Sequence, residues 1–240
     1  MITLWSLLYI GVKLIPLDVR IDGKDPSKLQ RADLNNRIVS FIHGLFAMFF
    51  GAYHWLFLRT ECGELNSSFE RFGMSFSVSY FIYDFFCMMA EGLLDNAMLI
   101  HHPLSIIGLS IPLFENVSGN YCMLAIFISE ISNPPMTLRH ILRLTGKRYT
   151  KAYEWSEVSF ISLFFFGRVV IATPIVYSCL KCEANHLFLK ISCGSLMIYS
   201  LYFIVQMYYT LMRRYKEVLS RKRLGIKLMW LEPLTKTEIE

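Results

Sequence analysis

Charge is scarce in this sequence. Only 18% of the 240 residues are Asp, Glu, Lys or Arg, whereas 54% are hydrophobic; a typical soluble domain has about a quarter charged residues. The charges cluster between long apolar runs such as Ile38–Leu58, Val158–Leu180 and Leu187–Met212. Runs of about 18 or more apolar residues predict membrane spans. The composition therefore excludes a soluble enzyme, a nucleic-acid-binding protein and a small secreted domain held together by disulfides.

The six cysteines follow no pattern that predicts a disulfide framework. Cys87 and Cys193 lie inside apolar runs, where a thiol behaves as a small hydrophobic group. Cys179 and Cys182 have the spacing of half a zinc site, but no second pair with suitable spacing accompanies them. We therefore expect no disulfide framework, no metal and no cofactor.

Long loops and internal repeats are also missing, which favours a single membrane domain. The runs are too long and too irregular for barrel strands, so we predict an all-α integral membrane protein with about seven transmembrane helices. The N-terminal run lacks a basic start and a cleavage site, and is interpreted as a retained first span. Pro134 and Pro135 should kink or end the fifth helix near Asn133. The expected spans are Ile2–Leu17, Ile38–Leu58, Gly73–Leu94, Ala97–Phe114, Gly119–Leu138, Val158–Leu180 and Leu187–Met212.

Basic residues predict the orientation of the spans. With seven spans, one side receives 18 Lys and Arg, and the other receives 3, or 4 if Lys190 is included. The positive-inside rule places the basic side, including the C-terminus, in the cytosol. Two glycosylation sequons, at Asn66 and Asn116, fall on the opposite side. The net charge of +5 is explained by residues flanking spans, and the basic tail is interpreted as a topology anchor in preference to a specific lipid-headgroup site.

Ionisable residues inside the spans are the first candidates for function, because they are costly at membrane depth. A helical rise of about 1.5 Å per residue places them all in the cytosolic half or near the midplane. Three carboxylates, Asp84, Glu91 and Asp95, are spaced to share one helix face, which should line the bundle interior or a wet cavity. The alternative is a structural polar core in which Arg168 pairs with Glu130 or Asp84. The candidates are Asp84, Glu91, Glu130, Arg168, His43, His101, His102, Asn133 and Gln206.

The adjacent pair His101 and His102 is the sharpest of these features. Neighbours on a helix point about 100° apart, so one imidazole is expected to face a cavity while the other supports it. A neutral imidazole can act as a nucleophile or a general base near neutral pH. Glu91, Glu130 and three histidines could also converge on a di-metal site, but no HxxxH or ExxH spacing supports one.

Five short motifs occur in order along the chain. They are Arg37–Gly44, Tyr80–Phe85, Ile100–Ser105, Ser129–Pro134 and Leu138–Arg139. Together they resemble the TLC domain, which is shared by ceramide synthases, translocating-chain-associating membrane proteins and small TLC-domain-containing proteins. The resemblance is greatest to the small branch that includes TLC-domain-containing protein five. It implies a TLC-type bundle divided into an N-terminal span and loop (1–34), a membrane domain (35–215) and a basic cytosolic tail (216–240).

The resemblance to ceramide synthases is incomplete at one cluster. Their His–His pair matches His101 and His102. Their later His-Asp-x-x-Asp cluster aligns with Ser129–Asn133, so that Ser129 replaces the histidine, while Glu130 and Asn133 stand for the two aspartates. This departure leaves open whether the protein is an enzyme.

Two functions follow as expectations. The first is an acyl-CoA-dependent N-acyltransferase of sphingoid-type amines, with acyl-CoA as substrate and no separate cofactor. The second is a non-catalytic protein that binds or senses membrane lipids; a receptor or transporter is disfavoured by the short loops. Either would reside in the endoplasmic reticulum or plasma membrane, with lipids as partners, no nucleic acid, and a homo-oligomer left open. The first assigns catalysis to His101, His102, Glu130 and Asp84, and substrate binding to His43, Glu91, Asn133 and Arg168.

Overall fold

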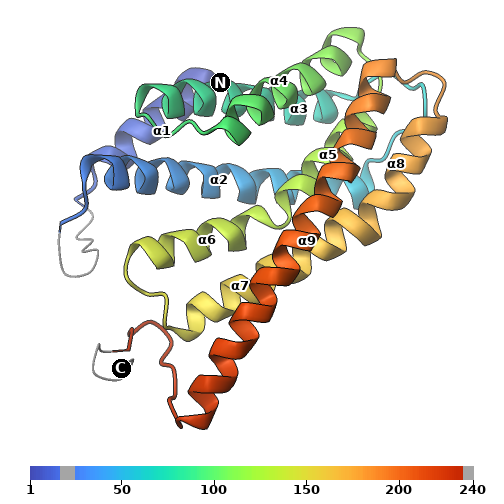
Figure 1. Ribbon diagram of the computed structural model, residues 1–240. Helices are drawn as coiled ribbons and strands as arrows, with labels where there is room; N and C mark the ends of the chain where they lie inside the picture. The colour runs from blue at the N-terminus through green and yellow to red at the C-terminus, as the bar shows by residue number, and fades with distance from the viewer. Residues whose placement is uncertain (17–24, 235–240) are drawn as a thin grey trace.

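The computed structural model describes residues 1–16 and 25–234, and within those ranges every extended regular element is a helix. Figure 1 shows α2 crossing the middle of the bundle, with α9 as its longest helix. The predicted all-α membrane bundle is confirmed. The helices are α1 (Ile2–Leu14), α2 (Lys28–Phe57), α3 (Ser68–Ala90), α4 (Asn96–Glu115), α5 (Gly119–Glu130), α6 (Asn133–Leu144), α7 (Lys151–Phe165), the π-helix η1 (Phe166–Ile171), α8 (Ala172–Lys181) and α9 (Leu187–Arg223).

Five of the seven expected spans are long and apolar enough to cross a membrane alone. They are α2, α3, α4, the continuous segment Lys151–Lys181 and α9. The first is a 13-residue helix, and the predicted end at Leu17 lies outside the described residues. The fifth is two 12-residue helices, α5 and α6, separated at Ile131–Ser132. The predicted break before Pro134 and Pro135 is thus confirmed.

Side-chain caps place two helix starts earlier than the apolar runs suggested. Ser27 accepts a hydrogen bond from the backbone of Gln30, whose side chain in turn accepts from the backbone of Ser27. This capping box starts α2 at Lys28, ten residues before the expected Ile38, because it satisfies the free N–H groups of the first turn. Ser67 and Glu70 form the same box at the start of α3. Hydrophobicity alone therefore located the spans but not their ends.

The predicted face of three carboxylates is wrong beyond Asp84. Helix α3 ends at Ala90, and Gly92, with φ of +70°, reverses the chain. Asp95 then belongs to the next helix, where its side chain accepts the backbone N–H of Met98 at 2.8 Å and caps α4. The three carboxylates do not share one helix face, because α3 ends before Glu91 and Asp95.

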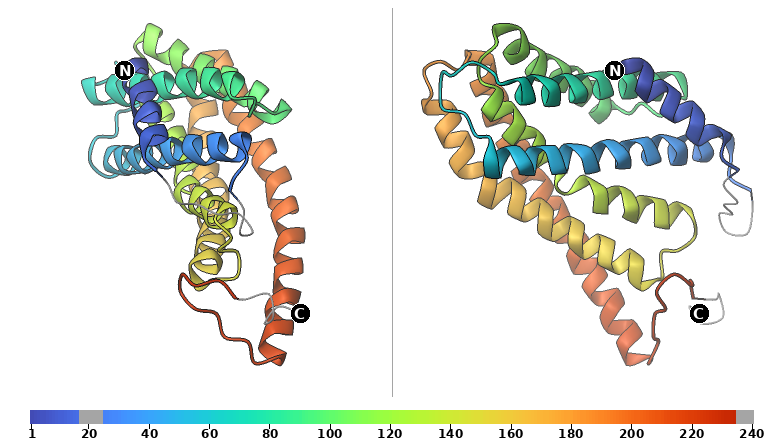
Figure 2. Two further views of the ribbon diagram at one scale, coloured as in Figure 1. Left: turned by 90° about the vertical axis from the view of Figure 1, so that its left-hand side faces the viewer. Right: turned by 180° about the vertical axis from the view of Figure 1, so that it is seen from behind.

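Helix α5 is the central element. Ten of its twelve residues are buried, on faces that contact α2, α3, α8 and η1, and both views in Figure 2 place it inside the bundle. Gly51 of α2 allows the closest approach, since a Cβ there would lie 2.5 Å from Cβ and 3.0 Å from Cα of Phe127. This contact fixes how α2 crosses α5.

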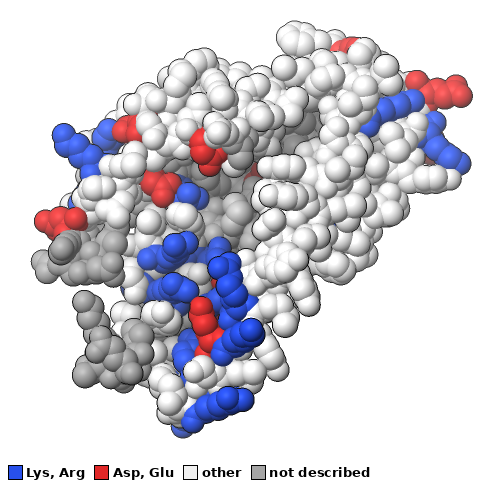
Figure 3. All heavy atoms as spheres, in the orientation of Figure 1, with Lys and Arg blue, Asp and Glu red and all other residues white. Residues whose placement is uncertain are grey.

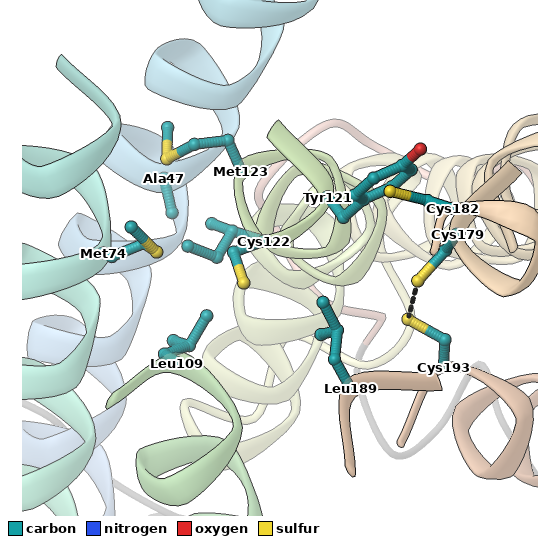
Figure 4. Packing of buried hydrophobic residues seen from close by; sticks show 11 residues of the cluster. Ala47, Met74, Leu109, Tyr121, Cys122, Met123, Cys179, Cys182, Leu189 and Cys193 are labelled. Atoms are coloured by element: carbon teal, nitrogen blue, oxygen red, sulfur yellow. Dashed lines mark hydrogen bonds between the residues drawn. The ribbon is translucent and has the colours of Figure 1, made fainter. Parts of the chain in front are cut away.

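Three loops are tied together at one end of the molecule, here called the disulfide end (residues 58–67, 115–118 and 182–186). Cys62 and Cys182 form a disulfide, which corrects the expectation of no disulfide framework. The pattern gave no signal because 120 residues separate the two cysteines, and only the helical topology brings their loops to one end. Ser118 also donates to Oδ1 of Asn185 at 2.7 Å. Figure 4 shows Cys182 beside the buried Cys179, whose Sγ is 3.5 Å from that of Cys193.

The two sequons lie at this same end. Asn66 is 3% exposed, and its side chain donates to the carbonyl of Pro112 at 2.8 Å and accepts from the backbone of Gly119 at 2.7 Å. Its amide is therefore an internal bridge between loops in the folded chain. Asn116, at a left-handed backbone position, accepts from Arg71 at 3.3 Å.

The opposite end, here called the basic end, contains the α6–α7 connection and the end of α9. Several ion pairs hold this end, and one carboxylate joins three helices. Glu157 accepts a hydrogen bond from Arg139 of α6 at 3.0 Å and from Arg214 of α9 at 2.7 Å. Both guanidinium groups lie over the ring of Tyr153, at 5.6 and 5.3 Å. The ends of α6, α7 and α9 are thereby fixed to one another.

Enlarging Gly51 should separate α2 from α5. We expect Gly51→Ala to lower the free energy of unfolding by about 1–3 kcal/mol, because the new methyl group would meet the backbone of Phe127. Gly108→Ala is the control, since a Cβ there meets nothing within 4 Å, and alanine in a helix gains up to about 1 kcal/mol over glycine. Thermal unfolding in detergent measures both; a Gly51→Ala variant as stable as the control would contradict the packing.

Removing the disulfide should destabilise the fold. We expect Cys62→Ser to cost about 2–4 kcal/mol, because a long loop is released in the unfolded state. Cys87→Ser, which changes a free half-buried thiol, should cost less. Thermal unfolding measures the change, and maleimide labelling before and after reduction counts the thiols. Labelling of Cys62 in the unreduced protein would show that the bond is absent.

Candidate functional site

A chain of hydrogen bonds joins α2, α3 and α4 inside the bundle. Asp84 of α3 accepts from Nδ2 of Asn36 at 2.8 Å through one oxygen, and its other oxygen lies 2.7 Å from Nε2 of His102. Tyr83 donates to Oδ1 of Asn36 at 3.3 Å. Asn36, Asp84 and His102 are 5%, 5% and 2% exposed. The arrangement satisfies polar groups that lipid could not.

Both ring nitrogens of His102 are occupied. Its Nδ1 lies 3.0 Å from the carbonyl oxygen of Met98, which can only accept, so Nδ1 carries a proton. Its Nε2 lies against a carboxylate oxygen, and a bond of 2.7 Å there requires a second proton shared between His102 and Asp84. His102 therefore has no free nitrogen to offer a substrate.

His101 is the exposed member of the pair. Its ring meets His102 edge to face, with centroids 5.6 Å apart, and Phe81 at 6.0 Å. Among the described residues it makes no hydrogen bond. The structure therefore separates the pair: His101 is exposed and His102 is fixed. That one of the two imidazoles faces a cavity stays a prediction.

A second buried group joins α2 to the break between α5 and α6. His43 stacks on Tyr80 with centroids 3.8 Å apart, and its Nδ1 lies 4.0 Å from Oε2 of Glu130. The same oxygen accepts from Nδ2 of Asn133 at 2.8 Å. Gly44 makes room, since a Cβ there would lie 3.4 Å from Oε2 of Glu130. The helix break before Pro134 thus lets Asn133 turn back toward Glu130.

Arg168 does not form the ion pair expected of a structural polar core. Within the described part of the chain no carboxylate lies within 4.0 Å of it; its Nη1 donates to Ser200 at 3.3 Å, and its guanidinium lies 5.2 Å from the ring of Phe164. The pairing with Glu130 or Asp84 is therefore wrong. Arg168 lies on the π-helix η1, a local widening often found at functional sites.

Glu91 lies apart from this group. It follows α3 by one residue, where its carboxylate accepts from the Tyr9 hydroxyl at 2.9 Å and from Lys13 at 3.2 Å. These two partners hold the pKa of the Glu91 carboxyl below its usual value, the hydroxyl contributing most. Glu91 thus anchors α1 to α3, and Lys13 of α1 takes part in the same contact.

Sequence reasoning missed several polar partners. Asn36 was placed in a loop, because the apolar run begins only at Ile38. A separate buried cluster lies near the disulfide end: His54 lies 2.9 Å from Oε1 of Glu70, which also accepts from Thr60 at 2.7 Å. The capping pattern of Ser67 and Glu70 is a signal that could have located it.

The surface of the molecule is hollowed on one side (Figure 3). Figure 3 shows the surface hollowed between the helices that Figure 1 labels α4 and α9. A cavity of about 40 Å³ lies between α5, α8 and α9, lined by Arg168, Ser129, Ser200 and apolar side chains. No three His, Cys, Asp or Glu side chains of residues 1–16 and 25–234 are grouped as metal ligands. The chemical groups described at this site are imidazoles, carboxylates, side-chain amides and the guanidinium of Arg168.

Comparison with known families decides the identity of the fold. The TLC domain matches residues 33–215. The chain belongs to the TLC-domain family. It is also 30% identical over 118 residues to TLC domain-containing protein 4 C of Dictyostelium discoideum, a match that covers 45% of this chain and 42% of that protein. The matched region therefore spans less than half the length of this curated relative.

Membership confirms the family prediction and the membrane bundle of this TLC-domain protein. The expected pair His101 and His102 lies within the matched residues, as do Asp84, Glu130 and Arg168. The structure brings Asp84 and His102 into contact, sets Glu130 beside His43 and Asn133, and leaves Glu91 outside. The catalytic and substrate-binding roles stay predictions.

The bond between Asp84 and His102 should be essential for stability. We expect Asp84→Asn to cost about 3–5 kcal/mol, because removing one charge of a buried pair leaves its partner uncompensated. Glu91→Gln breaks a partly exposed contact with Lys13 and should cost under about 1 kcal/mol. Thermal unfolding in detergent compares the two. Equal stability of both variants would mean that the buried bond is not formed.

Proposed function

We propose that this TLC-domain protein transfers an acyl group from an acyl thioester such as acyl-CoA to a membrane lipid that bears an amine, with His101 as the catalytic residue. The observation that carries the proposal is that the two histidines differ in hydrogen bonding and exposure. His102 is fixed through both nitrogens, and His101, one position earlier on α4, is exposed with no hydrogen bond to the described residues. An exposed imidazole that makes no hydrogen bond keeps a ring nitrogen available to act as a nucleophile or a base.

The chemistry follows from those positions. A neutral His101 nitrogen attacks the thioester carbonyl, the carbon–sulfur bond breaks, and the thiol leaves with a proton. The lipid amine then attacks the acyl-imidazole carbon, the carbon–nitrogen bond to His101 breaks, and the amide product forms. Asp84 and His102 position the adjacent helix turn. Glu130, with one oxygen held by Asn133, is assigned to accept the amine proton and return it to the leaving His101 nitrogen, which restores the neutral imidazole.

The remaining predicted residues are assigned to binding. Arg168 lies on η1, and its guanidinium has one hydrogen bond, to Ser200, in the described chain, so it is suited to bind an anionic or carbonyl group of a substrate. His43 and Asn133 shape the wall around Glu130. Glu91 is not assigned a substrate role, because its carboxylate accepts hydrogen bonds from Tyr9 and Lys13 of α1.

A non-catalytic lipid-binding protein is the second candidate. It is favoured by the changed second cluster, in which Ser129 stands where ceramide synthases have histidine and Asn133 donates to Glu130. In this reading the polar group recognises a lipid headgroup without bond cleavage. Membrane-lipid composition would then depend on binding alone.

The two ends of the bundle support an assignment of sides. Disulfides persist in oxidising compartments, so the disulfide end is assigned to the lumen or cell exterior. The opposite end has the basic segments and is assigned to the cytosol. The endoplasmic reticulum and the plasma membrane both fit this orientation.

Acyl transfer tests the proposal directly. We expect the purified full chain in lipid nanodiscs to transfer an acyl group from acyl-CoA to a sphingoid amine, measured by mass spectrometry. His101→Ala should reduce the rate at least about a hundredfold, as loss of a positioned acid–base group does. His140→Ala, which removes a histidine 3.4 Å from Asp33 near the start of α2, should leave it unchanged.

The outcomes separate the two functions. Equal rates for the native chain and His101→Ala would exclude catalysis at this residue. Absence of transfer, together with lipid binding that His101→Ala and Asp84→Asn weaken in correctly folded protein, would establish the non-catalytic function. A lipid bound equally by all variants would exclude both.

A further inference from the structure

The C-terminal segment folds back onto the basic end of the bundle. After α9 the chain returns, and the carbonyls of Met229 and Trp230 accept hydrogen bonds from the backbone of Lys151 at 2.8 Å and Ala152 at 3.2 Å. Figures 1 and 2 show this return toward the start of α7. The tail therefore occupies the free N–H groups of that helix, and Trp230 is fixed against α7.

A pocket forms where the tail meets α6 and α7. Its volume is about 420 Å³, and its lining is apolar apart from two serine hydroxyls. Trp155 and Trp230 are 66% and 59% exposed, and Val158 on the same helix is 61% exposed. An apolar helix that exposes such side chains faces lipid, and tryptophan prefers the depth of the headgroups. The lining residues are Pro135, Leu138, Ala152, Trp155, Ser156, Ser159 and Trp230.

Basic residues outnumber acidic residues around the pocket: residues 139–159 and 217–232 contain nine Lys and Arg and four Glu, namely Glu154, Glu157, Glu217 and Glu232. Three of the nine are in ion pairs: Arg139 with Glu157, Arg148 with Glu217 and Arg221 with Glu154. The other six have no ion-pair partner among the described residues. Figure 3 shows basic side chains gathered over this end of the molecule.

We propose that this pocket binds one anionic phospholipid of the adjoining leaflet, with an acyl chain between Trp155 and Trp230 and the phosphate against Lys151 and its basic neighbours. The apolar lining fits a chain, the exposed tryptophans fit the interface, and the unpaired cations fit the phosphate. A zwitterionic lipid offers the same chain but no net charge. The site lies on α6, α7 and the tail, away from His101 on α4, so it is independent of acyl transfer.

Lipid binding to the purified full chain in detergent tests this site by native mass spectrometry. We expect dioleoyl phosphatidylglycerol to bind at least about fivefold more tightly than dioleoyl phosphatidylcholine, since each nearby cation favours an anionic headgroup. Trp230→Ala removes one wall of the pocket, and Ser159→Phe fills its space. Each should remove the preference for phosphatidylglycerol over phosphatidylcholine. Tyr202→Ala, which truncates an aromatic 57% exposed on α9, should retain it. Thermal unfolding verifies that each variant is folded, and Ser159→Phe leaves the tail contacts intact.

Three results would overturn the proposal. The first is equal affinity for the two lipids in the native chain. The second is an unchanged preference in Ser159→Phe. The third is displacement of phosphatidylglycerol by equimolar inorganic phosphate or coenzyme A, which would show that the basic surface recognises a soluble phosphate and that the acyl chain contributes nothing.

Discussion

Every polar group inside this bundle must find a partner within the protein, because hydrocarbon supplies none. The bond between Asp84 and His102 is the clearest case. It joins α3 to α4, and the other Asp84 oxygen binds Asn36 of α2, so one buried carboxylate sets the relative positions of three helices. Breaking it would leave an acidic group without compensation, which is far more costly than any single apolar contact.

The two ends of the bundle are fixed by different means. At the disulfide end, a covalent bond and loop hydrogen bonds connect segments far apart in sequence. At the basic end, Glu157 receives two arginines from α6 and α9. The middle of the bundle differs from both ends. It contains a helix break, a π-helix and an arginine without a carboxylate partner in the described chain, and π-helices are often found at functional sites.

The sequence predicted the helical bundle well because hydrophobic runs and prolines act locally. The break before Pro134 follows from the missing N–H group of proline, and the structure has it. Helix caps and tertiary contacts were harder to predict from the sequence. Ser27 and Asp95 set helix ends through hydrogen bonds that hydrophobicity does not report. The disulfide between Cys62 and Cys182 depends on the topology of the whole chain. The alternative in which Arg168 pairs with Glu130 or Asp84 rested on opposite charge alone, and the sequence does not report the distance between these side chains.

The histidine pair shows what structure adds to a motif. From the sequence, His101 and His102 are equivalent, since either could face the bundle interior. The helix phase is set by Asp84, which captures the second of the two and so turns the first outward. Both ring nitrogens of His102 are hydrogen-bonded, to Met98 and Asp84. Of the pair, only His101 makes no hydrogen bond to the described residues. A motif of two identical residues thus divides into one hydrogen-bonded side chain and one exposed side chain, and a carboxylate on the neighbouring helix determines which is which.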